Sequence, residues 1–406
     1  MHRLIAPFLQ FIQLEYSGSL LLLIASLVAV MLANSPLAPL YGVLLHSPIA
    51  VALGKISFHW TLHEAVNDGL MAIFFLVMGL EIKRELVTGE LSSLRRALLP
   101  ILAALGGVIT PALIYLVLNS GKEGAHGWGI PIATDIAFSL AVLSLFGRRI
   151  PLGLKVFLVT LAIVDDIVGV LVIATVYTRH LNYGYLFAAI LLFAGCLLLN
   201  RAGITRLSIY LSAGVLLWWT FHASGVHATL AGVLLAFAIP TTGHGSQESS
   251  KAQESPLHRL EAALHPWVSF GIVPLFAFAN AGVALKDLNS DAVWDPIFLG
   301  IFFGLVFGKA IGITLFSWIA VQLKLAELPH GVSWKQLHAV AWLGGIGFTV
   351  SIFIAGLAFE TEAQFALVRF AVLIASTAAA LVGIFLLTNL SRRSRVPESF
   401  EEQVPI

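Results

Sequence analysis

Two adjacent aspartates, Asp165 and Asp166, lie in the middle of a long apolar stretch. They are the only charged residues between Val156 and Tyr177, and a stretch of this length can cross a bilayer, which takes about 20 residues. A carboxylate near the bilayer centre costs roughly 2.5–3.5 kcal/mol on insertion scales. A span that contains two such groups is expected to use them for ion or proton transport. A purely structural pair is the alternative.

The composition indicates which kind of protein must position this pair. Of the 406 residues, 58% are hydrophobic and 11% are charged, and the mean hydropathy is +0.93. These values predict an all-α polytopic membrane protein rather than a soluble domain. The formal net charge of +1 argues against a nucleic-acid partner. The single cysteine, Cys196, provides no disulfide or metal framework.

Apolar stretches predict about twelve spans within one transmembrane domain, residues 17–390. No cleavable signal peptide is visible, so residues 1–16 are expected to form an interfacial segment. Residues 241–256 are polar and rich in Gly, Ser and Gln, which is typical of a linker, and residues 391–406 are expected to form a cytoplasmic tail. The predicted spans are 17–33, 62–80, 97–118, 125–146, 153–178, 183–199, 206–220, 224–240, 262–285, 296–321, 336–358 and 365–388.

Basic residues predict the orientation. With the N-terminus inside, most of the 23 Lys and Arg residues fall in cytoplasmic segments, so the positive-inside rule places both termini in the cytoplasm. The linker at 241–256 is then cytoplasmic too. Residues 49–60, before the second span, form either an extracytoplasmic hairpin with a turn at Gly54 and Lys55 or a simple loop. A free hairpin edge could pair with a second copy.

Two spans contain residues that interrupt a helix. Pro131 lacks an amide hydrogen and precedes Thr134 and Asp135, so the fourth span is expected to break just before them. Three glycines within residues 344–347 weaken the eleventh span by about 1 kcal/mol each relative to alanine. A proline kink and close helix packing are the respective alternatives. Paired interruptions favour an ion site near the membrane midplane.

Lys309 is a third charged group within a span. The sequence around it lacks the spacing and the Ser or Thr of a phosphate-binding loop. A lysine there needs a carboxylate partner or must lose its proton. Because neighbouring helical residues point about 100° apart, one aspartate of the pair could face Lys309 while the other faces a cavity. The sequence leaves open which does so.

These groups can exchange ions without a cofactor. A desolvated carboxylate can hold a proton near neutral pH, and when deprotonated it offers hard oxygen ligands to a small cation. Proton and cation then compete for the same oxygens, with Thr134 as a further ligand. Two adjacent acids would titrate as a coupled pair. Alternating access to the two sides would turn this competition into antiport.

Further titratable residues lie near the predicted ends of the spans. Acidic residues and a histidine at a cytoplasmic mouth could attract cations and respond to pH, although solvated helix ends with ordinary ion pairs are the simpler alternative for each. His227, at the start of the eighth span, suits a pH-linked or packing role near the far side. The candidates at the mouth are Asp68, Glu81, Glu85, Glu261 and His265.

The sequence resembles the NhaA family of sodium/proton antiporters over nearly its whole length. The resemblance implies twelve spans with inverted repeats and two interrupted helices, the fourth and the eleventh. It also implies electrogenic, pH-regulated exchange of cytoplasmic Na⁺ or Li⁺ for external H⁺ in the bacterial inner membrane, and a homodimer joined partly through residues 49–60. The matching segments are 133–138 (ATDIAF), 162–166 (AIVDD), 224–230 (SGVHATL), 264–267 (LHPW), 274–283 (PLFAFANAGV) and 345–349 (GIGFT).

The resemblance also implies roles for individual residues. Asp166 would be the main carboxylate for cation and proton, Asp165 its partner and the counter-ion of Lys309, and Asp135, beside Thr134, would offset the half-helix dipoles. Na⁺ or Li⁺ would bind at Asp166, Asp165 and Thr134. Glu81, Glu85, Glu261 and His265 match the family's pH-response cluster. Ala262 departs from relatives that have a titratable side chain there.

Two other functions are alternatives to antiport. An intramembrane aspartyl protease needs Tyr-Asp and Gly-x-Gly-Asp sequences, which do not surround Asp135 or Asp165, so an enzyme is not expected. A sodium-coupled solute symporter is the alternative transporter. The carboxylate pair together with Lys309 argues against it.

Overall fold

The structure, a computed structural model, describes residues 17–53, 56–178, 181–241, 255–288 and 291–393. The predicted N-terminal segment, nearly all of the linker and most of the tail lie outside these ranges. Helices make up most of the described chain, and the one sheet found there has two strands. Seven helical stretches are long and apolar enough to cross a membrane, and three bent helix pairs raise that number to ten. The protein is an all-α polytopic membrane protein, as predicted.

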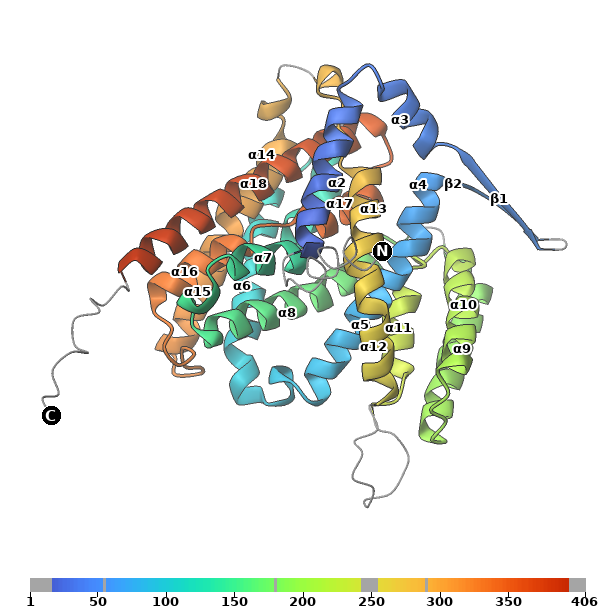
Figure 1. Ribbon diagram of the computed structural model, residues 1–406, viewed down its shortest axis with the longest axis horizontal. Helices are drawn as coiled ribbons and strands as arrows, with labels where there is room; N and C mark the ends of the chain where they lie inside the picture. The colour runs from blue at the N-terminus through green and yellow to red at the C-terminus, as the bar shows by residue number, and fades with distance from the viewer. Residues whose placement is uncertain (1–16, 54–55, 179–180, 242–254, 289–290, 394–406) are drawn as a thin grey trace, which may run out of the picture.

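The helices follow the predicted spans in chain order (Figure 1). The main elements are α2 (Ser17–Ala33), α3 (Ala38–Leu45), β1 (Pro48–Leu53), β2 (Ile56–Thr61), α4 (Leu62–Glu64), η1 (Ala65–Leu70), α5 (Met71–Val87), α6 (Leu94–Asn119), η3 (Glu123–Ile132), α7 (Ile136–Ser144), α8 (Leu152–Val176), α9 (Tyr183–Arg201), α10 (Leu207–Ser224), α11 (Leu230–Ala238), α12 (Pro256–Trp267), η5 (Val268–Ile272), α13 (Val273–Asn280), α14 (Pro296–Phe303), η8 (Gly304–Gly308), α15 (Lys309–Gln322), α16 (Trp334–Leu343), α17 (Phe348–Ala358) and α18 (Glu362–Arg393). Short 3₁₀ turns lie at Glu90–Ser92, Gly147–Arg149, Leu285–Asp287 and Ala292–Trp294.

The eighth span is shorter than predicted. α10 ends where Gly225 adopts a φ of 82°, a left-handed conformation that commonly terminates helices. The chain then turns before α11 begins at Leu230, so α11 has only nine residues. The helix therefore begins six residues after the predicted start at residue 224.

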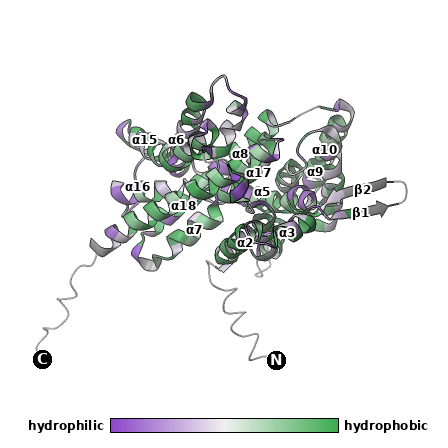
Figure 2. Cartoon of the chain, turned by 90° about the horizontal axis from the view of Figure 1, so that it is seen from above, coloured by the Kyte–Doolittle hydropathy of each residue, from purple (hydrophilic) through white to green (hydrophobic). Residues whose placement is uncertain are grey.

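The molecule has two ends along the direction of the spans. The hairpin end holds β1–β2 and the loop before α14, at the top of Figure 1. The opposite end, which we call the linker end, holds residues 88–93 and 323–333. An ion pair between Arg95, in the first turn of α6, and Glu327 (3.8 Å) joins the start of α6 to the second of these loops. Hydrophobic residues predominate along the helices (Figure 2).

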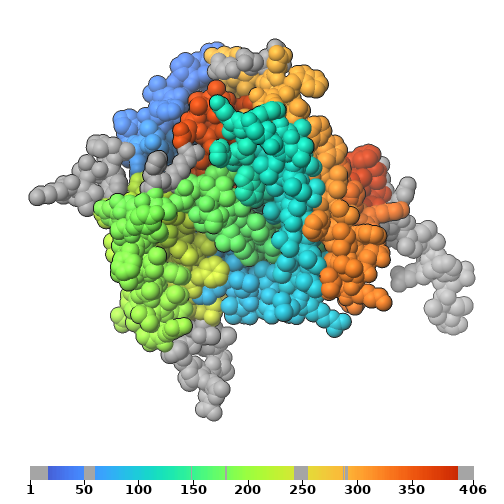
Figure 3. Space-filling view, turned by 180° about the vertical axis from the view of Figure 1, so that it is seen from behind, coloured from blue at the N-terminus to red at the C-terminus, as the bar shows by residue number. Residues whose placement is uncertain are grey.

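The segment before the second span is a hairpin rather than a simple loop. Its strands pair antiparallel from Pro48 opposite Thr61 to Leu53 opposite Ile56; the turn itself lies outside the described residues. At its base, the Trp60 ring meets Trp218 of α10 edge-on, with centroids 5.5 Å apart. α9 and α10 form one flank of the molecule (Figure 3). Only 11% of the apolar stretch of α9 is buried inside the protein.

The third and tenth spans cross in close contact. A Cβ atom added at Gly106 of α6 would collide with the Gly312 carbonyl of α15, and one at Gly312 would collide with the Gly106 carbonyl. Small residues of this kind let membrane helices approach backbone to backbone. Lys309 lies three residues before Gly312, so the α6–α15 crossing fixes the helix that holds this lysine.

Three spans contain a π-helical segment that the sequence analysis did not predict. These segments are η1 in the second span, η5 in the ninth and η8 in the tenth. π-turns inside α-helices occur frequently at functional sites. η8 ends at Gly308, directly before Lys309, so the local change of helix geometry helps to set where this lysine points.

Candidate ion-exchange site

The two broken spans meet near the centre of the molecule. The fourth span breaks at residues 133–135, between η3 and α7, with a bend of 41°. The eleventh breaks at residues 344–347, between α16 and α17, with a bend of 47°. Both interruptions lie where Pro131 and the glycines predicted them.

The interrupted segments satisfy each other's backbone groups. The amide of Asp135 donates to the Ile346 carbonyl (2.6 Å), and the Ser139 hydroxyl donates to the Leu343 carbonyl (2.8 Å). The Ser351 hydroxyl donates to a carbonyl of η3 (2.8 Å). Non-helical backbone is tolerated at membrane depth only where protein or water provides such partners. Side chains of each broken span thus tie it to the other.

Asp135 joins the N-termini of both half-helices. One of its oxygens accepts a hydrogen bond from the Phe138 amide at the start of α7 (3.0 Å). The other accepts from the Thr349 amide (3.2 Å) and the Thr349 hydroxyl (2.5 Å) at the start of α17. Helix N-termini favour negative charge. The Asp135 carboxylate, only 2% exposed, therefore stabilises two positive helix ends at once.

Asp165 forms a buried ion pair. Its Oδ2 lies 2.5 Å from the Lys309 Nζ and 2.7 Å from the Thr134 hydroxyl. Lys309 is fully buried. The Thr134 hydroxyl also lies 2.8 Å from the Gly344 carbonyl, and a hydroxyl has one proton to donate. Thr134 must therefore share its proton between the two acceptors, unless Asp165 is itself protonated and donates.

Asp166 differs from its neighbour. It is 6% exposed, and among the described residues its carboxylate accepts no hydrogen bond from another side chain or from the backbone. The negative charges that act on it are those of Asp165, Glu81 and Asp135, and Lys309 opposes them. A buried carboxylate with open oxygens and acidic neighbours can be neutralised by a proton or by a cation. Asp165 Oδ1, also buried and unpartnered in the described part of the chain, is a second open oxygen nearby.

The linker end holds an acidic cluster beside one arginine. Arg84 forms an ion pair with Glu261, which is 7% exposed, and lies 3.4 Å from Glu85. Glu81 lies one turn before Glu85 on the same face of α5. The second oxygen of Glu261 lies 3.9 Å from the His258 ring. Glu81 and Glu85 thus lie near the C-terminal end of α5, and Glu261 faces them from the middle of α12.

One residue assigned to this mouth lies elsewhere. His265 is exposed on α12, about one turn after Glu261, and its assignment to the mouth stays a prediction. Asp68 lies at the hairpin end, where it lines a hollow of about 300 Å³ with Arg369 and Asn280, because η1 begins the second span and Glu81 is more than three turns further along. The prediction that Asp68 belongs to the cytoplasmic group is therefore wrong in geometry. His227 lies on the far side, where its Nε2 contacts the Tyr177 carbonyl (2.9 Å).

Polar pairs that the sequence analysis missed connect several spans. Asn67 and Asn280 exchange amide hydrogen bonds of 2.8 and 3.2 Å, which join the second span to the ninth. His338 hydrogen-bonds to Thr314 and Trp342. Asn280 and His338 are polar residues inside apolar spans, and this was the available signal.

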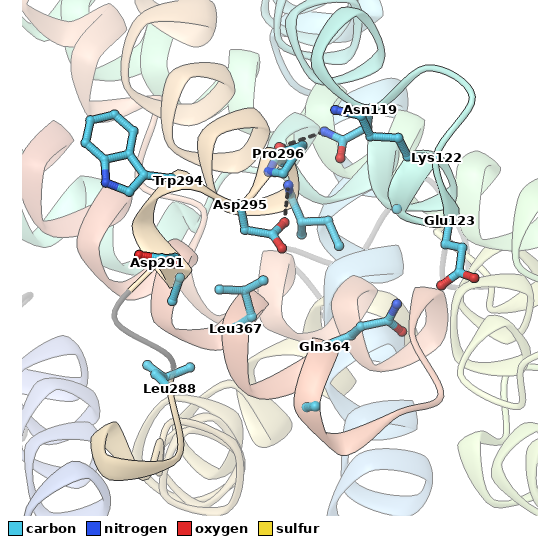
Figure 4. Close-up of a pocket in the computed structure, with 14 residues that line it drawn as sticks. Asn119, Lys122, Glu123, Leu288, Asp291, Trp294, Asp295, Pro296, Gln364 and Leu367 are labelled. Atoms are coloured by element: carbon cyan, nitrogen blue, oxygen red, sulfur yellow. Dashed lines mark hydrogen bonds between the residues drawn. The ribbon is translucent and has the colours of Figure 1, made fainter.

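A hollow in the described chain lies away from the carboxylates. It measures about 690 Å³ and lies at the hairpin end, between the start of α14 and the start of α18 (Figure 4). Asp295 caps α14 there through the Ile297 amide (2.8 Å), and Asn119 donates to the Pro296 carbonyl (2.8 Å). None of the predicted site residues lines it, so the chemistry of the carboxylates lies elsewhere.

Comparison with known proteins gives a consistent result. A family model described as Na⁺/H⁺ antiporter 1 matches residues 9–387. The chain belongs to the NhaA family of Na⁺/H⁺ antiporters. It is 49% identical over 383 residues to the Na⁺/H⁺ antiporter NhaA of Shewanella sp. (strain ANA-3), which covers 94% of this chain and 97% of the relative. It is 49% identical over 378 residues to the NhaA protein of Caulobacter vibrioides (93% and 89%), and 48% identical to NhaA 1 of Syntrophotalea carbinolica (94% and 96%).

Membership in the NhaA family confirms the resemblance and the fold class. It also agrees with the expectation of a transporter, because the relatives are named as antiporters. The crossing of the broken spans and the α8 carboxylates lie within the matched residues.

Proposed function

We propose that this protein exchanges Na⁺ or Li⁺ for H⁺ by competition of cation and proton for Asp166. The observation that supports this most directly is the difference between two adjacent buried acids. Asp165 is held by Lys309 and Thr134, whereas the Asp166 carboxylate accepts no hydrogen bond among the described residues. Asp166 is therefore the group whose charge is left for a mobile ion to neutralise.

The cation is expected to bind between the two acids. Asp166, the open Oδ1 of Asp165 and the Thr134 oxygen are hard ligands of the kind that small cations prefer. A cation at this position competes with Lys309 for Asp165 and with the proton for Asp166. Loading the cation therefore expels protons, and protonation releases the cation. Neither step requires a cofactor.

The direction of exchange follows from the orientation of the chain. On the positive-inside rule, we propose that both termini lie in the cytoplasm of a bacterium, with the protein in its inner membrane. The linker end then faces the cytoplasm, so the cluster of Arg84, Glu85 and Glu261 lies on the path of Na⁺ from that side. The hairpin end faces outward, where protons enter. Because two coupled acids and a lysine change protonation around a single cation, we propose that more charge moves as protons than as Na⁺ and that exchange is electrogenic.

Two further properties are part of the proposal. Exchange is regulated by pH through the cluster that contains Glu81, Glu85 and Glu261. The protein forms a homodimer through residues 49–60, because a two-stranded hairpin with free edges can add strands from a second copy. The base of this hairpin rests on α10 through Trp60 and Trp218, which holds it away from the transport path.

Proton flux in proteoliposomes tests the function. Purified protein is reconstituted with a pH-sensitive dye and an imposed pH gradient, and Na⁺, Li⁺ or K⁺ is added over a range of pH. Na⁺ and Li⁺, but not K⁺, should collapse the gradient, and Asp166→Asn should abolish the response. If no cation moves protons at any pH, antiport is wrong, and solute counterflow then tests the symporter alternative.

A further inference from the structure

The hollow at the hairpin end, between α6, α14 and α18, has no part in the proposed exchange. Its volume of about 690 Å³ falls in the range of sites that hold small organic molecules. Acidic side chains surround it: Glu123 follows α6, and Asp291 and Asp295 precede α14. In Figure 4, Asp295 and Glu123 lie on opposite sides of the hollow. The hollow is therefore lined by carboxylates that are spread apart rather than gathered at one point.

A buried amide in the wall of this hollow has an oxygen without a partner. The Asn119 side chain is fully buried, and its Nδ2 donates to the carbonyls of Tyr115 (3.1 Å) and Pro296 (2.8 Å). Because two carbonyls hold the nitrogen, the amide cannot be turned round, and Oδ1 is fixed as an acceptor. No described group donates to it. A Cβ atom at Gly124 would lie 3.0 Å from this oxygen, so the glycine keeps the space beside it small and open.

The charges around the hollow favour a cation. Among the described residues, neither Glu123 nor Asp291 forms an ion pair, and Asp295 uses one oxygen to accept from the Ile297 amide (2.8 Å). Lys122 is the opposing charge in the lining. Its Nζ donates to the Leu118 carbonyl (3.0 Å), which holds it at the end of α6. Three carboxylates thus border the hollow, and two of them have no partner in the part of the chain that the structure describes.

An anion is a poorer match, although the N-termini of α14 and α18 border the hollow. Helix N-termini bind anions through free backbone amides. α14 begins with Pro296, which has no amide hydrogen, and the next amide is bound by Asp295. Near the start of α18, the Gln364 amide donates to the Thr361 hydroxyl (3.4 Å). The protein itself therefore caps both helix ends.

A single metal ion is also a poor match. The described residues contain no group of three or more His, Cys, Asp or Glu side chains placed to hold one metal ion. Carboxylates on opposite sides of a hollow instead suit a ligand that carries positive charge at both of its ends. Trp294, 74% exposed beside the hollow, offers the aromatic face that organic cations prefer.

We propose that this hollow binds a linear organic di- or polyamine. One primary ammonium group lies at Asp291 and Asp295, next to Trp294, and a second lies at Glu123. The Asn119 oxygen favours an ammonium group that has N–H bonds to donate over a quaternary one. None of the residues proposed for ion exchange lines the hollow, so this inference does not depend on the exchange function.

Calorimetric titration of the purified protein in detergent with spermidine tests the proposal. Spermidine should bind saturably with a Kd of about 1 mM or less. Asp291→Asn and Asp295→Asn should each raise the Kd about fivefold, the value of one exposed charge pair, and the double variant should raise it at least about tenfold. Asparagine caps a helix as well as aspartate does, so α14 should be unaffected. Glu327→Gln, at an acid 86% exposed at the linker end, is the matched control.

Two other cations separate specific binding from screening of negative charge. Tetramethylammonium and Mg²⁺, each at the ionic strength of the spermidine solution, should produce no saturable heat. Equal binding of all three cations, no binding of spermidine, or an unchanged Kd in the double variant would each refute the amine site.

Thermal unfolding guards against a folding defect in the variants. Spermidine should raise the melting temperature of the wild type, because a ligand that binds only the folded state stabilises it, and should raise that of the double variant less. Without spermidine the two proteins should melt alike. If the double variant is already less stable, Asp291→Asn alone decides, since this exposed side chain caps no helix. Equal increases in melting temperature would contradict the site.

The headgroup of a membrane lipid is the other source of a primary ammonium group. Spermidine binding is therefore compared in nanodiscs of phosphatidylethanolamine and of phosphatidylcholine, whose quaternary ammonium has no N–H. Equal affinities would support a free amine as the ligand. Weaker binding in phosphatidylethanolamine would overturn the two-ended ligand in favour of the lipid. Proton flux should be the same in the double variant and the wild type, so loss of exchange and loss of amine binding are separate results.

Discussion

The crossing of the broken spans and the carboxylate pair on α8 lie side by side, yet the buried carboxylates in these two regions differ in how many hydrogen bonds they accept. At the crossing, Asp135 accepts three hydrogen bonds and completes two helix N-termini. On α8, the Asp166 carboxylate accepts none among the described residues. A buried acid that its protein has fully hydrogen-bonded stabilises the fold, whereas an open one is available to an ion. We therefore propose that the number of hydrogen bonds to each acid distinguishes a structural carboxylate, Asp135, from a transporting one, Asp166.

The largest effect is expected at Asp166. Asp166→Asn keeps the size of the side chain but removes the charge for which cation and proton compete. Exchange should fall by about 100-fold or more, as for the loss of an essential proton-transfer group, while the melting temperature in detergent stays close to that of the wild type. Sodium-driven proton release that survived in this variant would remove Asp166 from the centre of the site.

The next largest effect is expected at the ion pair. Lys309→Ala leaves Asp165 buried without its counter-ion, which should lower the free energy of unfolding by about 3–5 kcal/mol. Adding Asp165→Asn to this variant removes the orphaned charge and should restore much of the melting temperature. Lys122→Ala, at an exposed lysine, is the control. Equal melting temperatures for Lys309→Ala and the wild type would contradict the pair.

Asp135 tests the other half of the comparison. Asp135→Asn weakens charge-assisted hydrogen bonds to Phe138 and Thr349, so it should destabilise the protein by about 1.5–3 kcal/mol but leave measurable exchange. Thermal unfolding and proton flux on the same preparation give both numbers. A variant that melts like the wild type but does not transport would place Asp135 with Asp166 instead.

The smallest effect is expected at the linker end. Glu261→Gln breaks the ion pair with Arg84, and together with Glu81→Gln it should move the pH profile of exchange by less than about one unit, with a smaller change in the maximal rate. Glu327→Gln, at an acid whose side chain is 86% exposed, should leave the profile in place. A uniform loss of rate with an unchanged profile would count against a regulatory role for this cluster.

Much of this arrangement could be predicted because each of these residues is unfavourable in an apolar transmembrane helix. Aspartates in an apolar span, a proline before Thr134 and clustered glycines each cost energy locally, and the structure places both interruptions where these residues lie. The sequence did not decide which aspartate pairs with Lys309, because helical periodicity shows on which face of a helix a residue lies but not which residues of another helix pack against that face. Asp68 was assigned to the wrong end of its span because the sequence around a carboxylate near a span end does not show which of the two ends it is.

Other features had no local signal. A π-turn changes one hydrogen-bond register and leaves composition and periodicity nearly unaltered, so η8 before Lys309 could not be foreseen. The contact of His338 with Thr314 joins residues 24 positions apart and depends on how α15 and α16 pack. Tertiary packing, rather than propensity, decides such pairs.

The glycine crossing of α6 and α15 restricts how this molecule can move. Two backbones in direct contact at Gly106 and Gly312 leave no side chains to slide past one another, so these helices should travel together as one piece. Lys309 would then keep its distance from α6 throughout a transport cycle. Spectroscopic labels on α6 and α15 should report a constant separation, and rearrangement should be confined to distances measured from this pair to the remaining spans.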